Sequence, residues 1–419
     1  MARKMKDSGI EWIGEIPEGW TKNKVIRLFD TIGSGTTPKN VTSDFPVVNW
    51  IQSGDITGSF MPACKNVISA NLLSQYSALK VYPAPFIIIA MYGASVGNAS
   101  ISLIDGCVNQ ACCVLSSPSC NLHYAFYVIK STQSYLVRKA VGGGQPNISQ
   151  ETIKQLWLPL PPLSTQDIIV RNLDAICSKI DNLLSSVHAS IEEYKKLKQA
   201  VITQAVTKGV RGEREIKESK LPWASKIPKA WNTCAIRHIM FECKERTKDG
   251  HEEQLSVTQQ FGIIKSSDAS IANPSLSLDD WRIVAIGDIV FNKYKAHSGV
   301  FFVSPFSGIV TFNYSVYRCF PNCYAKYFEY QYKTHGCISE FRTRMHGVGN
   351  SISPLYTKDL MKIKVVCPPL DEQKEISNYL DAKCAEIDKL IAKKEQLVKE
   401  LESYKKSLIY EVVTGKREV

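Results

Sequence analysis

The sequence predicts a mixed α+β protein. In it, two α/β domains are separated by two long helices that pair as an antiparallel coiled coil. The main evidence is an internal repeat, which indicates two copies of one module. Pro161-Pro162-Leu163, Gln166 and Leu173-Asp174-Ala175 recur as Pro368-Pro369-Leu370, Gln373 and Leu380-Asp381-Ala382, at a constant offset (368 − 161 = 207). Trp12, Ile16-Pro17 and Trp20 recur as Trp223, Ile227-Pro228 and Trp231 (223 − 12 = 211). A duplicated chain suggests a duplicated task, such as two half-sites on one ligand.

The repeat divides the chain into four segments. Residues 1–157 and 209–366 form two globular domains, each followed by a helical region, residues 158–208 and 367–419. In the first domain, the apolar runs 45–51, 86–91 and 111–115 are typical of strands, and residues 123–140 of a helix. In the second domain, residues 281–286 and 288–291 resemble strands and residues 324–341 a helix. The two domains therefore share a fold while differing strongly in sequence.

The two helical regions carry the clearest periodicity. Apolar residues are spaced by alternating steps of three and four, which is typical of a coiled-coil seam. The predicted seam consists of Leu173, Ile180, Leu183, Val187 and Leu197 in the first helix, and Leu380, Ile387, Leu390, Leu397, Leu401 and Leu408 in the second. A helix over residues 164–207 would be roughly 65 Å long. A helix of that length with one apolar stripe needs a partner, and each helix has one in the other copy.

Composition restricts the classes of partner. The formal net charge is +11, and the 44% hydrophobic content is that of an ordinary soluble protein. Basic charge favours a polyanionic partner, most simply nucleic acid, although a basic protein without such a partner remains an alternative. The chain has no apolar run of membrane-spanning length and no signal peptide, so no membrane contact is expected and the cytoplasm is the expected location.

The cysteines do not indicate a metal site. The chain has 13 cysteines and no Cys-x-x-Cys. The densest groups, Cys107 to His123 and Cys319 to Cys337, match no structural zinc spacing. Their apolar surroundings suggest cysteines that pack as small hydrophobes. We therefore expect no metal, and in this compartment no disulfides.

The repeated motifs resemble one family, the DNA-specificity (S) subunits of type I restriction-modification systems. The resemblance covers essentially the whole chain. It rests on the segments Trp12 to Trp20, Leu158 to Leu163 and Val206-Thr207, and on their second copies Ile227 to Trp231, Cys367 to Gln373 and Val412 to Gly415. One departure is Thr165, which stands before Gln166 where the second copy has Glu372 before Gln373.

The resemblance implies that each domain is a target recognition domain that reads one half of a split sequence in double-stranded DNA. The paired helices would set the spacing between the half-sites and dock two methyltransferase (M) subunits, with restriction (R) subunits added to the complex. The chain itself would be non-catalytic. S-adenosylmethionine, ATP and Mg²⁺ would bind to the partner subunits, and the assembled complex would methylate adenine at N6 and cleave DNA.

The search for catalytic motifs supports that implication. An adenine methyltransferase of this family would need an Asn/Asp-Pro-Pro-Tyr/Phe motif, but both Pro-Pro pairs here precede leucine. Residues 33–39 resemble a phosphate-binding loop, but Pro38 stands where its second glycine should be. No catalytic residue is predicted. Two alternatives remain open: a fused enzyme with its own active site, and a coiled-coil scaffold that binds protein without sequence-specific DNA binding.

Candidate DNA-binding residues are the polar and basic side chains of the loops, because such groups read base edges and hold phosphates. In the first domain they are Thr36, Thr37, Lys39, Asn40, Gln52, Tyr92, Lys139, Gln145 and Asn147. In the second they are Lys244, Arg246, Lys248, Gln259, Gln260, Lys293, Lys295, His297, Arg342, Arg344, His346 and Asn350. For each one, the alternative is a solvated surface side chain. The aromatic run from Tyr324 to Tyr332 has helical spacing and is expected to pack rather than to stack on bases.

Overall fold

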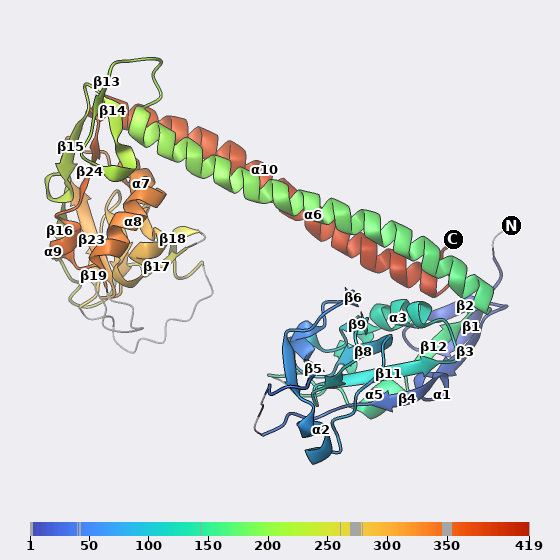
Figure 1. The fold of residues 1–419 in the computed structure, drawn as a ribbon. Coiled ribbons are helices and arrows are strands. Elements are labelled where there is room, and N and C mark those ends of the chain that lie inside the picture. Colours follow the sequence, from blue (N-terminus) through green and yellow to red (C-terminus); the bar gives the residue numbers. More distant parts are fainter. Residues whose placement is uncertain are drawn as a thin grey trace. The chain divides into compact units, whose positions relative to one another are not determined.

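The computed structural model describes residues 3–39, 41, 43–142, 144–259, 261–268, 278, 280–345 and 354–418 (Figure 1). The chain divides into two compact units. Unit 1 comprises residues 1–187 and 396–419, and unit 2 comprises residues 188–395. Each unit combines one strand-rich domain with part of both long helices, α6 (Leu163–Lys208) and α10 (Leu370–Val413).

The domain of unit 1 is built around a five-stranded sheet of order β4-β11-β8-β9-β6. Smaller pairings are β10-β5-β7, β1-β2 and β12-β3. Its strands are β1 (Met5–Ile10), β2 (Gly14–Pro17), β3 (Thr21–Lys24), β4 (Phe29–Gly33), β5 (Val47–Ile51), β6 (Phe60–Met61), β7 (Asn66–Ser69), β8 (Phe86–Ala90), β9 (Ala99–Ser102), β10 (Cys107–Val108), β11 (Cys112–Pro118) and β12 (Trp157–Leu160). Every residue of β8 is buried, as expected for an unbroken apolar run that is covered on both faces.

Short helices cover this sheet and connect its strands. They are α1 (Val25–Leu28), α2 (Asn71–Gln75), α3 (Leu122–Ser131), α4 (Gln133–Lys139) and α5 (Gln150–Lys154), with the 3₁₀ turns η1 (Ser53–Asp55) and η2 (Gly93–Ser95). The side chain of Asn121 caps α3 by accepting a hydrogen bond from the Tyr124 amide, which fixes where the helix begins. The helix predicted over residues 123–140 is thus two helices, α3 and α4.

The domain of unit 2 repeats this plan with a four-stranded sheet of order β16-β23-β20-β21. Its strands are β13 (Ile216–Glu218), β14 (Lys226–Pro228), β15 (Asn232–Ala235), β16 (Met240–Cys243), β17 (Leu255–Thr258), β18 (Gly262–Lys265), β19 (Arg282–Val284), β20 (Ile289–Asn292), β21 (Phe301–Val303), β22 (Gly308–Val310), β23 (Tyr314–Cys319) and β24 (Lys364–Cys367). Its helices are α7 (Ala325–Tyr332), α8 (His335–Arg344) and α9 (Thr357–Leu360), with the 3₁₀ turns η3 (Pro222–Ala224), η4 (Ile236–His238) and η5 (Lys293–Ser298).

The two domains share several strand pairings. The hairpin β1-β2 has its counterpart in β13-β14, and the pair β12-β3 in β24-β15. The register also agrees, because Met5 pairs with Pro17 in the first hairpin and Ile216 with Pro228 in the second. The prediction of two α/β domains that share a fold is confirmed.

Each unit contains an antiparallel helix pair, as predicted (Figure 1). In unit 1, the start of α6 and the end of α10 share one hydrophobic core, and Lys405 Nζ lies 2.5 Å from Asp181 Oδ1. In unit 2, Lys198 Nζ lies 2.6 Å from Asp388 Oδ2. These ion pairs occupy equivalent positions of the repeat, because both partners are related by the offset of 207. The same contact therefore closes the helix pair in each unit.

Only part of the predicted seam is buried. Leu173, Ile180, Leu380, Ile387 and Leu408 are buried, and Val187 and Leu401 are half-buried. By contrast, Leu183, Leu197, Leu390 and Leu397 are exposed. Two antiparallel helices bury a narrow stripe, and these four leucines lie outside it. They leave apolar groups on the surface of each unit.

Two tyrosines fix each domain to both helices. In unit 1, Tyr124 donates a hydrogen bond to the carbonyl of Val413 in α10 (3.2 Å), and Tyr127 donates to Asp174 in α6 (2.6 Å). In unit 2, Tyr327 donates to the carbonyl of Val206 in α6 (3.1 Å), and Tyr330 donates to Asp381 in α10 (2.6 Å). The tyrosines are related by one offset (327 − 124 and 330 − 127 are both 203). As predicted, the aromatic run from Tyr324 to Tyr332 packs into the fold.

The repeated glutamine bonds to the first proline of each Pro-Pro-Leu motif. Gln166 donates to the carbonyl of Pro161 (2.9 Å) and accepts from the Asn121 amide (2.9 Å). Gln373 donates to the carbonyl of Pro368 (2.8 Å) and accepts from the Tyr324 amide (2.7 Å). One buried side chain thus joins the proline segment, the helix start and the domain, which leaves little freedom for substitution there.

Candidate nucleic-acid interface

Four of the nine predicted DNA-binding residues of unit 1 lie near one edge of its domain. Gln52 follows β5, Tyr92 lies two residues after β8, and Asn109 follows β10. Backbone hydrogen bonds join these segments: Asn109 N to Ile51 O (3.1 Å) and Met91 N to Ala111 O (2.8 Å). Thr37 Oγ1 donates to Gln110 Oε1 (2.6 Å), and Tyr92 forms a β-bridge with Asn147. Thr37, Gln52, Tyr92 and Asn147 therefore surround Asn109 and Gln110.

The other predicted residues of unit 1 behave differently. Thr36 is half-buried, and Lys39 and Gln145 are exposed. Lys139 Nζ forms an ion pair with Glu11 (3.0 Å), and this hydrogen bond lowers the pKa of Glu11 and raises the pKa of Lys139. Its charge is thus matched within the domain. Asn40 lies outside the described residues.

Five of the predicted basic residues of unit 2 lie near η5. Asn292, at the end of β20, accepts hydrogen bonds from the amides of Tyr294 (3.0 Å) and Lys295 (3.1 Å), which sets the turn. Arg342 Nη2 from α8 donates to the carbonyl of His297 (3.2 Å). Burial, followed by the nearby charges of Arg282 and Arg246, lowers the pKa of Lys293. Arg246, Lys293, Lys295, His297 and Arg342 thus belong to one basic region.

A polar cavity of about 520 Å³ opens beside this basic region. Thr258, Asn292, Tyr294, Lys295 and Asn313 are among the residues that line it. Hydroxyl, amide and ammonium groups of this kind match the donors and acceptors that base edges present in the major groove.

The remaining predicted residues of unit 2 are not joined to this region by the contacts described above. Lys244, Lys248 and Gln259 are exposed, and Arg344 is half-buried near the end of α8. Gln260, His346 and Asn350 lie outside the described residues.

The structure adds residues that the sequence analysis missed. Tyr294 occupies the position in unit 2 that Tyr92 has in unit 1, since both follow the central strand. Each is also one residue beyond a backbone hydrogen bond, from Ile148 to Met91 in unit 1 and from Leu355 to Lys293 in unit 2. Both rings are exposed, Tyr92 by 41% and Tyr294 by 47%. Asn109, Gln110 and Asn292 were missed as well. The available signal was a polar or aromatic residue within two positions of the end of a strand.

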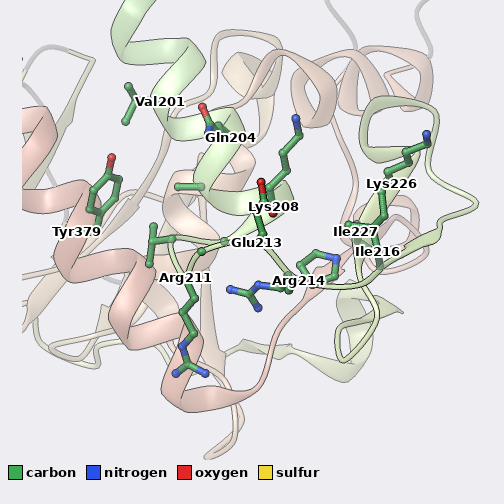
Figure 2. A pocket seen from close by; sticks show the side chains of 15 residues that line it. Val201, Gln204, Lys208, Arg211, Glu213, Arg214, Ile216, Lys226, Ile227 and Tyr379 are labelled. Atoms are coloured by element: carbon green, nitrogen blue, oxygen red, sulfur yellow. The ribbon is translucent and has the colours of Figure 1, made fainter.

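A second basic cavity, of about 590 Å³, lies at the end of α6 in unit 2 (Figure 2). Lys208, Arg211, Arg214 and Lys226 are among its lining residues. The two arginines are engaged in the fold, because Arg211 pairs with Asp371 (2.9 Å) and Glu375 (2.7 Å), and Arg214 with Glu372 (2.7 Å). These ion pairs fasten the segment after α6 to the start of α10. We therefore interpret this cavity as part of the structural joint between α6 and α10, and not as a binding site.

Other kinds of site find little support in the part of the chain that the structure describes. Within it, no three His, Cys, Asp or Glu side chains are placed so that they could hold a metal ion. None of the helices described there is both long and apolar enough to cross a membrane.

Comparisons with known proteins agree with this architecture. The family described as "Type I restriction modification DNA specificity domain" matches residues 17–193 and 258–400. A Methanocaldococcus jannaschii protein, provisionally named the specificity subunit of type I restriction enzyme MjaX, is 25% identical over 96% of this chain and 95% of its own length. The MjaVIII specificity subunit from the same organism is 24% identical over 70% of this chain and 69% of its own.

A solved structure shares the fold. That structure is described as "Structural basis underlying complex assembly and conformational transition of the type I R-M system". It aligns with a TM-score of 0.69 over 95% of this chain and 98% of its own, at 14% identity. Because the family matches two ranges that together cover most of the sequence, the chain belongs to the type I restriction-modification DNA specificity subunits.

Proposed function

We propose that this subunit reads a bipartite target in double-stranded DNA, with one half-site for each domain. The observation that carries the proposal is the repeated attachment of each domain to the helix pair. In unit 1, Tyr124 bonds to α10 and Tyr127 to α6. In unit 2, the equivalent Tyr327 bonds to α6 and Tyr330 to α10, so the two helices exchange roles. Two domains held alike, but with different loops, suit two half-sites of different sequence.

The two domains would contact DNA by different means. In unit 1, the Thr37, Gln52, Gln110 and Asn147 side chains are neutral donors and acceptors, the kind that read base edges. In unit 2, Lys293, Lys295 and Arg342 supply positive charge for phosphates, and Asn292 and Asn313 line the adjacent cavity. We expect affinity to depend more on unit 2 and to fall with salt.

We further propose that each helix pair docks one methyltransferase subunit, which makes two in the complex. The ion pair Lys405–Asp181 in unit 1 lies within one turn of two exposed apolar residues, Leu183 and Tyr404. Its equivalent in unit 2, Lys198–Asp388, lies within one turn of Leu390 and Leu197, which are also exposed. Equivalent apolar groups in the two units suit two copies of one partner.

A matched pair of substitutions tests the docking proposal. Leu183→Glu combined with Leu390→Glu should abolish co-purification of the methyltransferase subunit. Ile168→Glu is the control, because Ile168 is also exposed on α6 and its repeat counterpart is already Glu375. Equal loss with the control, or full retention with the double variant, would contradict the proposed docking surface.

We assign no catalytic role to this chain. S-adenosylmethionine, ATP and Mg²⁺ are proposed to act on the partner subunits, where adenine N6 methylation and, with restriction subunits, cleavage would take place. The complex would work in the cytoplasm, where its DNA substrate is found.

Exchange of one domain tests the bipartite reading. Residues 21–157 would be replaced by the corresponding segment of another specificity subunit, and methylated sites would then be mapped in cells. We expect one half of the target to change while the other half stays the same. A change in both halves together would overturn the proposal of one half-site for each domain.

A further inference from the structure

Unit 2 holds a carboxylate at the start of α10. Glu372, in the first turn of this helix, accepts hydrogen bonds at Oε2 from the Trp231 indole N–H (3.0 Å) and from Arg214 Nη1 (2.7 Å). A second guanidinium, that of Arg211, lies 3.6 Å from the other oxygen, Oε1. The Glu372 side chain is only 7% exposed. An indole N–H, two guanidinium groups and a helix N-terminus thus surround one buried carboxylate.

Unit 1 repeats this arrangement but has no carboxylate in the same place. Trp20 and Arg3 stand at the positions of Trp231 and Arg214, at the offset of 211 that relates the two N-terminal motifs. The guanidinium carbon of Arg3 lies 5.3 Å from the centre of the Trp20 ring, and that of Arg214 lies 5.7 Å from the Trp231 ring. Thr165 stands where the second copy has its glutamate, and the first turn of α6 contains no acidic residue.

The indole N–H of Trp20 needs an acceptor. Trp20 is 2% exposed, and its Nε1 atom has no hydrogen-bond partner among the described residues. Buried polar groups are nearly always hydrogen-bonded, so this donor favours a ligand that brings an acceptor. The N-terminus of a long helix favours negative charge, and the Arg3 guanidinium does the same. The donor, the cation and the helix end therefore all favour an anion.

Equivalent contacts orient the two tryptophans and the two helix starts. The backbone amides of Trp20 and Trp231 each donate to the carbonyl of the proline three residues earlier, at 2.9 Å in both units. The hairpins β1-β2 and β13-β14, which come before them, pair in the same register. Gln166 and Gln373 tie the helix starts to their domains by the same hydrogen bonds. The Trp20 indole therefore faces the first turn of α6, as the Trp231 indole faces that of α10.

We propose that unit 1 binds a small carboxylate anion, such as formate or acetate, at the start of α6. One oxygen of the ligand accepts from the Trp20 indole N–H and from the Arg3 guanidinium, as Glu372 Oε2 accepts from the equivalent pair in unit 2. Because threonine is shorter than glutamate, the ligand takes the place of the missing carboxylate group beside Thr165. A single guanidinium suits a singly charged ligand better than sulfate.

The ligand can reach this site from solvent. Arg3 is exposed and Thr165 is half-buried, so only the indole lies deep in the fold. A bound carboxylate would tie the segment before β1 and the residue after the β1-β2 hairpin to the start of α6. In unit 2, Glu372 makes the equivalent connection from within the chain. The stability of this joint should therefore depend on the anion in unit 1 and not in unit 2.

The test follows the indole N–H resonances of the full chain, labelled with ¹⁵N-tryptophan, by NMR. The chain has seven tryptophans, and the Trp20 resonance is the one that disappears in Trp20→Phe. Replacement of sodium chloride by sodium formate at constant ionic strength should shift the Trp20 resonance until it saturates, and should leave the Trp231 resonance in place. A Trp20 resonance that does not move, or that sodium sulfate shifts as much as formate does, would overturn the proposal.

Two exchanges between the copies of the repeat make the test specific. Thr165→Glu supplies the carboxylate from within the chain, so the Trp20 resonance should no longer respond to formate. Glu372→Thr gives unit 2 the arrangement of unit 1, so the Trp231 resonance should begin to respond. A Trp20 response that persists in Thr165→Glu would contradict the proposed site. If Glu372→Thr does not fold, the titrations of the wild type and of Thr165→Glu still decide the matter.

Discussion

Thr165→Glu should stabilise unit 1, because it supplies a partner that unit 2 already has. In unit 2, the buried Trp231 donates its indole N–H to Glu372 (3.0 Å), and Arg214 pairs with the same carboxylate (2.7 Å). In unit 1, the corresponding Trp20 is buried and its indole nitrogen has no hydrogen-bond partner among the described residues. Thr165 stands at the position of Glu372 (372 − 165 = 207).

The rest of the site is already present in unit 1. Arg3 lies over the Trp20 ring at 5.3 Å, much as Arg214 lies over Trp231 at 5.7 Å, and the two arginines are related by the offset of 211. The first turn of α6 has no acidic residue, whereas α10 has Asp371 and Glu372 in its first turn. A carboxylate at position 165 would thus meet an indole N–H, a guanidinium and a helix N-terminus.

The expected gain is about 1 kcal/mol. A hydrogen bond to a charged group contributes roughly 1.5–3 kcal/mol, and an acid in the first helical turn about 0.3–1 kcal/mol. Ordering a glutamate side chain costs roughly 1.5–2 kcal/mol, which offsets much of this. For a unit of this size, about 1 kcal/mol corresponds to a rise in Tm of about 2–4 °C.

Differential scanning calorimetry of the full chain would measure the effect. Thr165→Gln is the matched control: it offers an acceptor without a charge and should give a smaller gain. The gain should vanish in a Trp20→Phe background, which removes the indole N–H. An unchanged or lower Tm for Thr165→Glu, or a gain that persists with Trp20→Phe, would mean that a carboxylate at position 165 does not stabilise unit 1 through the Trp20 indole.

Three further predictions address the fold, DNA binding and spacing. Tyr327→Phe removes a buried hydrogen bond to the Val206 carbonyl. It should lower the free energy of unfolding, measured by urea titration, by about 1–3 kcal/mol. No measurable loss would mean that this contact does not hold the domain on α6. Lys295→Ala should weaken DNA binding and reduce the slope of log K against log salt by about 1. Lys139 is already paired with Glu11, so Lys139→Ala should leave that slope unchanged. Equal effects of the two substitutions would remove the basis for assigning the interface to the region around Lys295. Seven residues inserted into each long helix, after Val187 and after Glu395, should lengthen the unread spacer by roughly 3 base pairs. The reason is that seven helical residues add about 10 Å, the length of about 3 base pairs of duplex. An unchanged spacer in the methylome would mean that the helices do not set the distance between the half-sites.

Much of the fold could be predicted because the repeat was visible in the sequence. Pro161 and Gln166 recur as Pro368 and Gln373 because each pair forms the same buried hydrogen bond, and such contacts tolerate few residue types. The heptad spacing likewise predicted α6 and α10. It could not predict which leucines stay exposed, such as Leu183 and Leu390, because periodicity does not reveal how narrow the buried stripe is.

The candidate DNA-binding surface was harder to predict. Tyr92 and Tyr294 are separated by 202 residues rather than 207, so their equivalence emerges only when the strands before them are superposed. Asn109 and Gln110 join Thr37 and Tyr92 only through pairing of strands distant in sequence.

A methylome would show whether this chain directs methylation to a split target. The chain would be co-expressed with its methyltransferase subunit in cells that lack other adenine methylation, and modified adenines would be mapped by single-molecule sequencing. We expect a split motif of two short specific parts around an unread spacer, and we expect it to disappear when this chain is omitted. A continuous motif, or methylation that is unchanged without this chain, would contradict it.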